Sequence, residues 1–128
     1  YLNIEINGGF KTLKSISKAL ENVDGVMIGR ASYEDCYLLA NLNKLNDENS
    51  KVISRGEIIK SYIPYVQEEL EKGSNVHMLA SPLHSLLQGQ TGSRKYKQLL
   101  SSANVKKDTL VQILNEILET MPQDILWN

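Results

Sequence analysis

The sequence predicts two parts, an α/β segment over residues 1–52 and an all-α segment over residues 53–128. Two short apolar stretches, each followed by glycine and separated by one amphipathic helix, predict a β-α-β unit with parallel strands. In the second part, apolar residues recur at intervals of three and four, which is typical of helices that bury one face. We therefore expect a small parallel sheet followed by a group of packed helices.

The two expected strands lie within residues 2–6 and 23–28. The second contains an apolar run without alternation, Val26-Met27-Ile28, which is typical of a strand buried on both faces of a parallel sheet. Thr12 is expected to cap the connecting helix. The apolar face of that helix has the spacing i, i+3 and i+7, at Leu13, Ile16 and Leu20.

Glycine-containing loops follow both strands, Asn7-Gly8-Gly9 after the first and Gly29-Arg30 after the second. The carboxyl ends of neighbouring parallel strands share one edge of a sheet, so we expect the two loops to lie side by side. Glycine permits tight turns and close approach of the backbone, Arg30 is a bidentate anion donor, and the following helix N-termini add a favourable dipole. Either loop alone also fits an ordinary strand-to-helix turn, but the pair favours a phosphate site.

Residues 31–42 are predicted to form a helix, and the polar residues 43–50 are the expected linker to the second part. Cys36 would lie inside this helix with no histidine or lysine within a turn to lower the pKa of its thiol, so we expect it to pack rather than react. The residues expected to face the sheet are Leu38, Leu39 and Leu42.

Four amphipathic helices with short connections are predicted in the second part, which indicates an antiparallel bundle. Gly73, Gly89 and Gly92 are expected to separate them, Pro64 to kink the first helix or mark its second half, and Pro82 to begin or kink the second. The four expected apolar faces are Ile59, Tyr62, Ile63, Val66 and Leu70; Leu79, Leu83, Leu86 and Leu87; Tyr96, Leu99 and Leu100; and Leu110, Ile113, Leu114, Ile117 and Leu118.

Composition excludes several classes of protein. The chain has 128 residues, a net charge of −1 and a hydrophobic content of 41%, which is typical of a folded globular protein. No apolar run approaches the roughly 18 residues of a membrane span, and the single cysteine cannot form an internal disulfide. His77 and His84 have no third ligand at metal-binding spacing. We expect a monomeric, cytoplasmic protein without membrane or metal.

Two parallel strands leave faces and edges uncovered, and barrels of parallel strands need about 250 residues. We therefore expect the chain to be the C-terminal part of a longer one.

Basic residues gather between Gln88 and Lys107, where the sequence has no acidic residue. Arg94 and Lys97 are three positions apart, which places them on the same side of a helix. A local basic face on a nearly neutral protein suits a polyanion such as RNA, although an ordinary solvated helix face has the same pattern. The basic residues of this stretch are Arg94, Lys95, Lys97, Lys106 and Lys107.

Three motifs together resemble a known family. They are Asn7-Gly8-Gly9-Phe10, the run DGVMIGRASY over residues 24–33, and the run LLQGQTGSRKY over residues 86–96. Their order and spacing resemble the C-terminal portion of bacterial tRNA-dihydrouridine synthases, and the third motif is similar to the A subfamily. The resemblance extends to about Ser102.

The resemblance implies the last two βα units of an FMN-binding (β/α)8 barrel, a TIM barrel, followed by a helical tRNA-binding domain. It implies NADPH-dependent reduction of a D-loop uridine in tRNA, with the catalytic cysteine upstream of this chain. It further implies that Asn7, Gly8, Gly9, Gly29 and Arg30 contact the FMN phosphate. The implied tRNA contacts are Arg94 and, with lysine in place of the usual arginine, Lys97.

The sequence departs from the family pattern at two places. Ser81-Pro82 replaces a usual Arg-His pair, and Cys36 replaces a common proline. Two other functions remain open from sequence: a different FMN-dependent barrel oxidoreductase acting on a small molecule, and a truncated RNA-binding fragment without activity.

Overall fold

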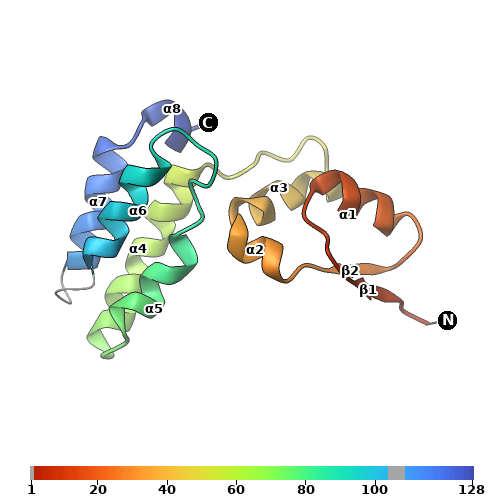
Figure 1. Ribbon diagram of the computed structural model, residues 1–128, viewed down its shortest axis with the longest axis horizontal. Coiled ribbons are helices and arrows are strands. Elements are labelled where there is room, and N and C mark those ends of the chain that lie inside the picture. The colour runs from red at the N-terminus through yellow and green to blue at the C-terminus, as the bar shows by residue number, and fades with distance from the viewer. Residues whose placement is uncertain (1, 104–108) are drawn as a thin grey trace. The chain divides into compact units, whose positions relative to one another are not determined.

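The computed structural model describes residues 2–103 and 109–128 (Figure 1). The contacts divide the chain into two compact units, with the division between Val52 and Ile53. No helix of the described residues has both the length and the apolar character needed to cross a bilayer.

The first unit is a β-α-β segment followed by two helices. Its elements are β1 (Glu5–Asn7), α1 (Leu13–Leu20), β2 (Gly25–Met27), α2 (Arg30–Glu34) and α3 (Tyr37–Asn46). The two strands are parallel, as predicted, and Asn7 pairs with Met27 at the carboxyl ends. Thr12 caps α1 as predicted, because its hydroxyl oxygen accepts a hydrogen bond of 3.2 Å from the Ser15 N–H.

The prediction of strands buried on both faces is wrong for the described residues. All three residues of β1 are exposed, and in β2 only Gly25 and Val26 are half-buried. Ile6 retains 41% and Met27 47% of its accessible surface. The described residues supply a sheet of only two strands with few elements packed on it, so the apolar side chains are left uncovered.

The predicted helix over residues 31–42 is two helices, α2 and α3. Asp35 interrupts them with a non-helical backbone, φ −149° and ψ 89°, and its carboxylate accepts a hydrogen bond of 3.1 Å from the Tyr37 N–H. Such local bonding by aspartate competes with helix continuation. Cys36 consequently lies at the start of α3, half-buried, and not in the middle of a helix. Because α3 continues to Asn46, the polar connection is shorter than expected.

The second unit contains only helices and turns among its described residues. Its elements are α4 (Arg55–Glu71), α5 (Val76–Ala80), the 3₁₀ helix η1 (Ser81–Leu83), α6 (Ser93–Ser102), α7 (Thr109–Thr120) and α8 (Gln123–Leu126). Ser54 and Glu57 form a capping box that begins α4, and Pro64 lies inside this helix without dividing it. Gly73 ends it with a φ of +87°, a conformation that favours glycine.

Helix α7 packs against both α4 and α6, and α8 packs against α4 (Figure 1). The predicted apolar face of α7 is confirmed except that Leu118 is only half-buried. The largest fully buried side chains come from α4, α6, α7, α8 and the segment between α4 and α6: Ile59, Val66, Leu86, Leu87, Tyr96, Leu100, Leu110, Leu114, Ile117 and Leu126.

The predicted second helix, with its leucines between residues 79 and 87, is not one helix. It is α5, then η1 with Pro82, then turns up to Gly92. The four leucines are nevertheless buried. Their backbone carbonyls accept hydrogen bonds from neighbouring helices, since Tyr96 Oη donates to Leu83 O at 2.7 Å and Arg55 Nε donates to Leu86 O at 2.9 Å. Side-chain donors thus replace the helical bonds that this segment lacks.

Candidate functional site

One pocket lies at the carboxyl edge of the two-stranded sheet. It has a volume of about 330 Å³, and both strand-to-helix loops line it. The parallel register explains this, because β1 ends at Asn7 directly opposite the end of β2 at Met27. All five residues expected at a phosphate site line the pocket: Asn7, Gly8, Gly9, Gly29 and Arg30.

The two glycines of the first loop have positive φ angles, +147° for Gly8 and +68° for Gly9. A side chain at either would be strained, although no protein atom lies within 4 Å of where its Cβ would be. The first loop therefore requires glycine for its backbone conformation. It leaves open space beside its peptide groups, where an anion can approach them.

Gly29 differs from this pair. Its φ and ψ are both −100°, and an added Cβ would meet only Met27 Sδ at 3.7 Å, an ordinary contact. Packing within the described residues therefore leaves room for a side chain here. Glycine at this position leaves the backbone open to the close approach of a ligand that the sequence predicts.

The expected helix-dipole contribution at the second loop is weaker than predicted. Helix α2 has only five residues, from Arg30 to Glu34, so few peptide dipoles add along its axis. Charge in the pocket comes instead from side chains. Its lining contains two cations, Arg30 and Lys11, and no carboxylate. This set of donors fits a phosphate group.

Lys11 is the charged pocket residue that the sequence prediction missed. The sequence feature that could have indicated Lys11 is its position in the first loop, two residues after Gly9 and just before Thr12, the cap of α1.

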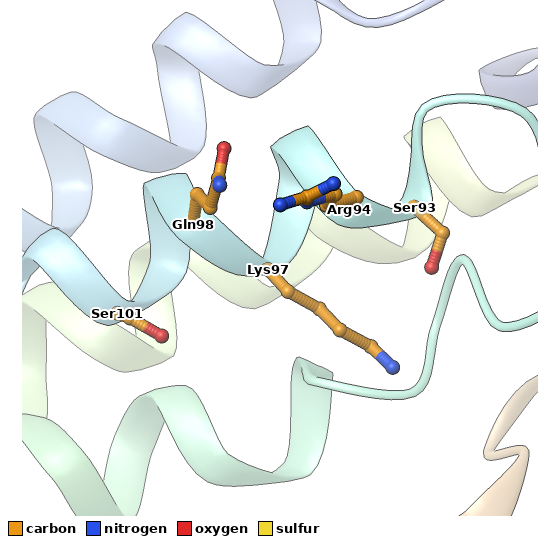
Figure 2. A pocket seen from close by; sticks show the side chains of 5 residues that line it. All are labelled: Ser93, Arg94, Lys97, Gln98 and Ser101. Carbon is orange, nitrogen blue, oxygen red and sulfur yellow. The ribbon is translucent and has the colours of Figure 1, made fainter.

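The second candidate site is a basic groove on α6 (Figure 2). It is wide and open, with a volume of about 710 Å³, and Figure 2 shows its side chains along this helix. Gly92 caps the start of α6, at the predicted helix boundary, and has a φ of +86°. Arg94 and Lys97 both line the groove, while Lys95 does not. The full lining is Ser93, Arg94, Lys97, Gln98 and Ser101.

The two groove cations are held differently. Lys97 is half-buried, and its Nζ donates a hydrogen bond of 2.9 Å to Gln88 Oε1. Arg94 is exposed, and it forms no ion pair with any carboxylate of residues 2–103 or 109–128. None of these carboxylates therefore neutralises its guanidinium. The remaining basic residues of this stretch in the sequence, Lys106 and Lys107, lie outside the described residues.

His84 lies near His77 and Lys97. Burial, followed by the charges of His77 and Lys97, lowers the pKa of His84 below its usual range. Within the described ranges no three histidine, cysteine or acidic side chains gather in a way that could hold a metal ion.

Known proteins resemble this chain along nearly its whole length. Proteins named tRNA-dihydrouridine(20/20a) synthase from Vibrio parahaemolyticus, Pseudomonas putida and Synechocystis are 32%, 35% and 35% identical to it. These matches cover 98%, 94% and 92% of this chain, but only 39%, 36% and 36% of the relatives. The chain thus spans less than two fifths of their length.

The profile of one family, described as dihydrouridine synthase, matches residues 2–125. That match includes both glycine loops and the basic helix, so the chain belongs to the dihydrouridine synthase family.

Proposed function

We propose that this chain is the C-terminal part of an FMN-dependent tRNA-dihydrouridine synthase that reduces D-loop uridine in tRNA with NADPH. Family membership and the names of the relatives support this proposal. Those names also point to positions 20 and 20a of the tRNA as the uridines reduced. The complete enzyme would be a cytoplasmic monomer.

The two units take separate roles in this proposal. Residues 1–52 form the last two βα units of a TIM barrel, and residues 53–128 form a helical bundle that binds tRNA. The catalytic cysteine belongs to the part of the enzyme that precedes this chain. Cys36 serves packing, because it is half-buried at the start of α3.

The observation that carries the proposal is the pocket formed by the two loops. The Arg30 guanidinium would bind the FMN phosphate, and peptide groups at Gly8, Gly9 and Gly29 would approach it, with Asn7 at the end of β1 beside them. When bound, FMN supplies hydride transfer between NADPH and the C5–C6 double bond of uridine. The residues of this chain only bind and orient the cofactor.

The basic groove on α6 favours tRNA over a small-molecule substrate. Arg94 is exposed and has no carboxylate partner among the described residues, and it lines the groove with Lys97. A small substrate inside a barrel needs no such external surface, whereas an RNA backbone binds basic side chains through its phosphates.

The pocket is tested by Arg30→Ala and Gly29→Ala in the complete enzyme, measured as FMN bound per protein and as FMN affinity. Loss of a charge-assisted bond at this exposed position should weaken binding by about 1.5 kcal/mol, or roughly tenfold. Gly29→Ala should also weaken it, because a methyl group would hold the phosphate away from the backbone, while within the protein it would make only an ordinary contact with Met27.

Lys14→Ala is the matched control, because Lys14 is an exposed cation on α1 that does not line the pocket. Normal FMN affinity in both pocket variants would contradict the assignment.

A further inference from the structure

We propose that Lys11 is a second cation of the phosphate site, held by Glu34 when the pocket is empty and transferred to the phosphate when the ligand binds. This inference rests on the proposed function, because it assumes that the pocket receives the FMN phosphate. It adds a binding residue and its counterion, which neither the loop motifs nor the family match assigns.

The first observation is the position of Lys11. It lines the same pocket as Gly8, Gly9 and Arg30, but from the opposite loop to Arg30. Two cations would then face a phosphate from two sides. A phosphate monoester carries close to two negative charges near pH 7, so one guanidinium neutralises only part of it.

The second observation is the ion pair that Lys11 forms. Its Nζ lies 3.7 Å from Glu34 Oε2, and 65% and 61% of the two side chains are exposed. A pair this long and this exposed is weak, because solvent screens it and both side chains lose freedom in forming it. Lys11 can therefore leave Glu34 at little cost when a more strongly charged anion is present.

The third observation is the place of Glu34 on α2. It lies four residues after Arg30, so both project from the same side of that short helix. Arg30 forms no ion pair with the described carboxylates, whereas Lys11 does. Among the described residues, the Glu34 carboxylate therefore pairs with the lysine and not with the arginine. It would also repel a bound phosphate, so it acts as a competitor for Lys11 and not as a ligand.

The two cations would contribute differently to binding. Arginine offers a planar fork that can fix the orientation of a phosphate, whereas lysine contributes a compact charge on a flexible stem. We expect Lys11 to add affinity and Arg30 to add both affinity and orientation.

The test titrates the flavin-free form of the complete enzyme with FMN and, separately, with riboflavin, which lacks the phosphate, and follows flavin fluorescence. Lys11→Ala should raise the Kd for FMN about three- to tenfold, as expected for one exposed cation against a phosphate. The Kd for riboflavin should stay unchanged. Lys11→Arg should retain most of the FMN affinity, and Lys14→Ala should match the parent protein.

Glu34→Gln tests whether Glu34 competes with the phosphate for Lys11 or instead positions Lys11 for binding. It should lower the Kd for FMN by about two- to threefold, because it frees Lys11 and removes a nearby negative charge. Weaker FMN binding by Glu34→Gln would overturn the exchange, since the carboxylate would then be holding Lys11 in its productive place.

The remaining outcomes distinguish this inference from the proposed function. If Arg30→Ala weakens FMN binding and Lys11→Ala does not, the inference fails and the phosphate site stands. If Lys11→Ala weakens riboflavin and FMN equally, its role is structural and the inference fails. If neither variant changes FMN binding, the phosphate site itself is wrong and the inference falls with it.

Discussion

At the scale of single residues, the contact between Gly56 and Trp127 shows how the end of the chain is held. Gly56 is buried near the start of α4, and a Cβ added there would lie 2.8 Å from three carbons of the Trp127 ring. The indole Nε1 donates a hydrogen bond of 3.0 Å to Gln123 Oε1, which fixes the ring relative to α8. Gly56 therefore provides the space in which the indole packs on α4.

We expect Gly56→Ala to displace Trp127 from α4 in the 128-residue chain. Trp127 is its single tryptophan, so emission should shift to longer wavelength and quenching by acrylamide should increase. Overpacking should cost about 1–2 kcal/mol of unfolding free energy. Ser61→Ala, an exposed change on the same helix, is the control. Unchanged fluorescence in Gly56→Ala would show that the ring does not pack there in solution.

At the scale of elements, the segment from α5 to Gly92 is shaped by its surroundings more than by its own helix propensity. Its leucines are buried among the helices of the second unit, and its carbonyls bind Tyr62, Tyr96 and Arg55 side chains, the first through a bond of 3.0 Å from Tyr62 Oη to Leu79 O. This arrangement also fixes His84 in a partly buried position beside His77 and Lys97.

The lowered pKa of His84 predicts that mild acid destabilises the chain. In the unfolded chain this histidine binds a proton as the pH falls through about 6.5, whereas in the folded chain it does so only at lower pH. Folding stability from His84 is therefore complete above about pH 6.5 and decreases as the pH falls toward the folded pKa.

Denaturant unfolding at pH 7 and pH 5.5 measures this effect. His84→Gln should lose less stability between the two values than the parent chain does. An equal loss in both proteins would mean that His84 titrates alike in the folded and unfolded chain.

At the scale of the whole molecule, the chain carries two chemically different sites, one in each unit. The loop pocket combines glycine backbone with two cations, and the groove on α6 presents Lys97 beside Arg94, which pairs with no carboxylate of the described residues. In the proposed enzyme the first site holds the cofactor and the second binds the substrate. Substitutions in one site should therefore leave binding at the other site unchanged.

We expect Arg94→Ala/Lys97→Ala in the complete enzyme to weaken tRNA binding while FMN content and thermal stability stay near normal. Each lost phosphate contact should reduce the salt slope of binding by about one unit, because fewer counterions are released. Titration of labelled tRNA at several salt concentrations measures both effects.

Lys95→Ala is a matched control for this experiment, because Lys95 is exposed on the same helix but does not line the groove. Equal affinity and equal slope in the double variant and the parent would identify the groove as an ordinary solvated face and favour a small-molecule substrate.

Much of the local structure could be predicted from sequence because its signals act over a few residues. Thr12 caps α1, Gly73 ends α4 and Gly92 begins α6, each through bonds or backbone angles within one turn. The apolar faces of α6 and α7 followed from helical spacing, except that Leu99 and Leu118 are only half-buried. The meeting of the two glycine loops followed from parallel pairing, which needs only the order of the strands.

The features that sequence alone did not predict depend on contacts between distant residues. The leucines of residues 79–87 show the same periodicity whether they form one helix or several short turns, and burial against α4 and α6 decides between them. Lys11 enters the loop pocket, and Trp127 packs on Gly56, only once the chain has brought those segments together. The sequence by itself thus determined the helices α1, α4, α6 and α7 and the edge of the sheet that carries the loops. Tertiary structure decided which side chains complete each site, because a contact across the fold leaves no periodic pattern in either segment that makes it.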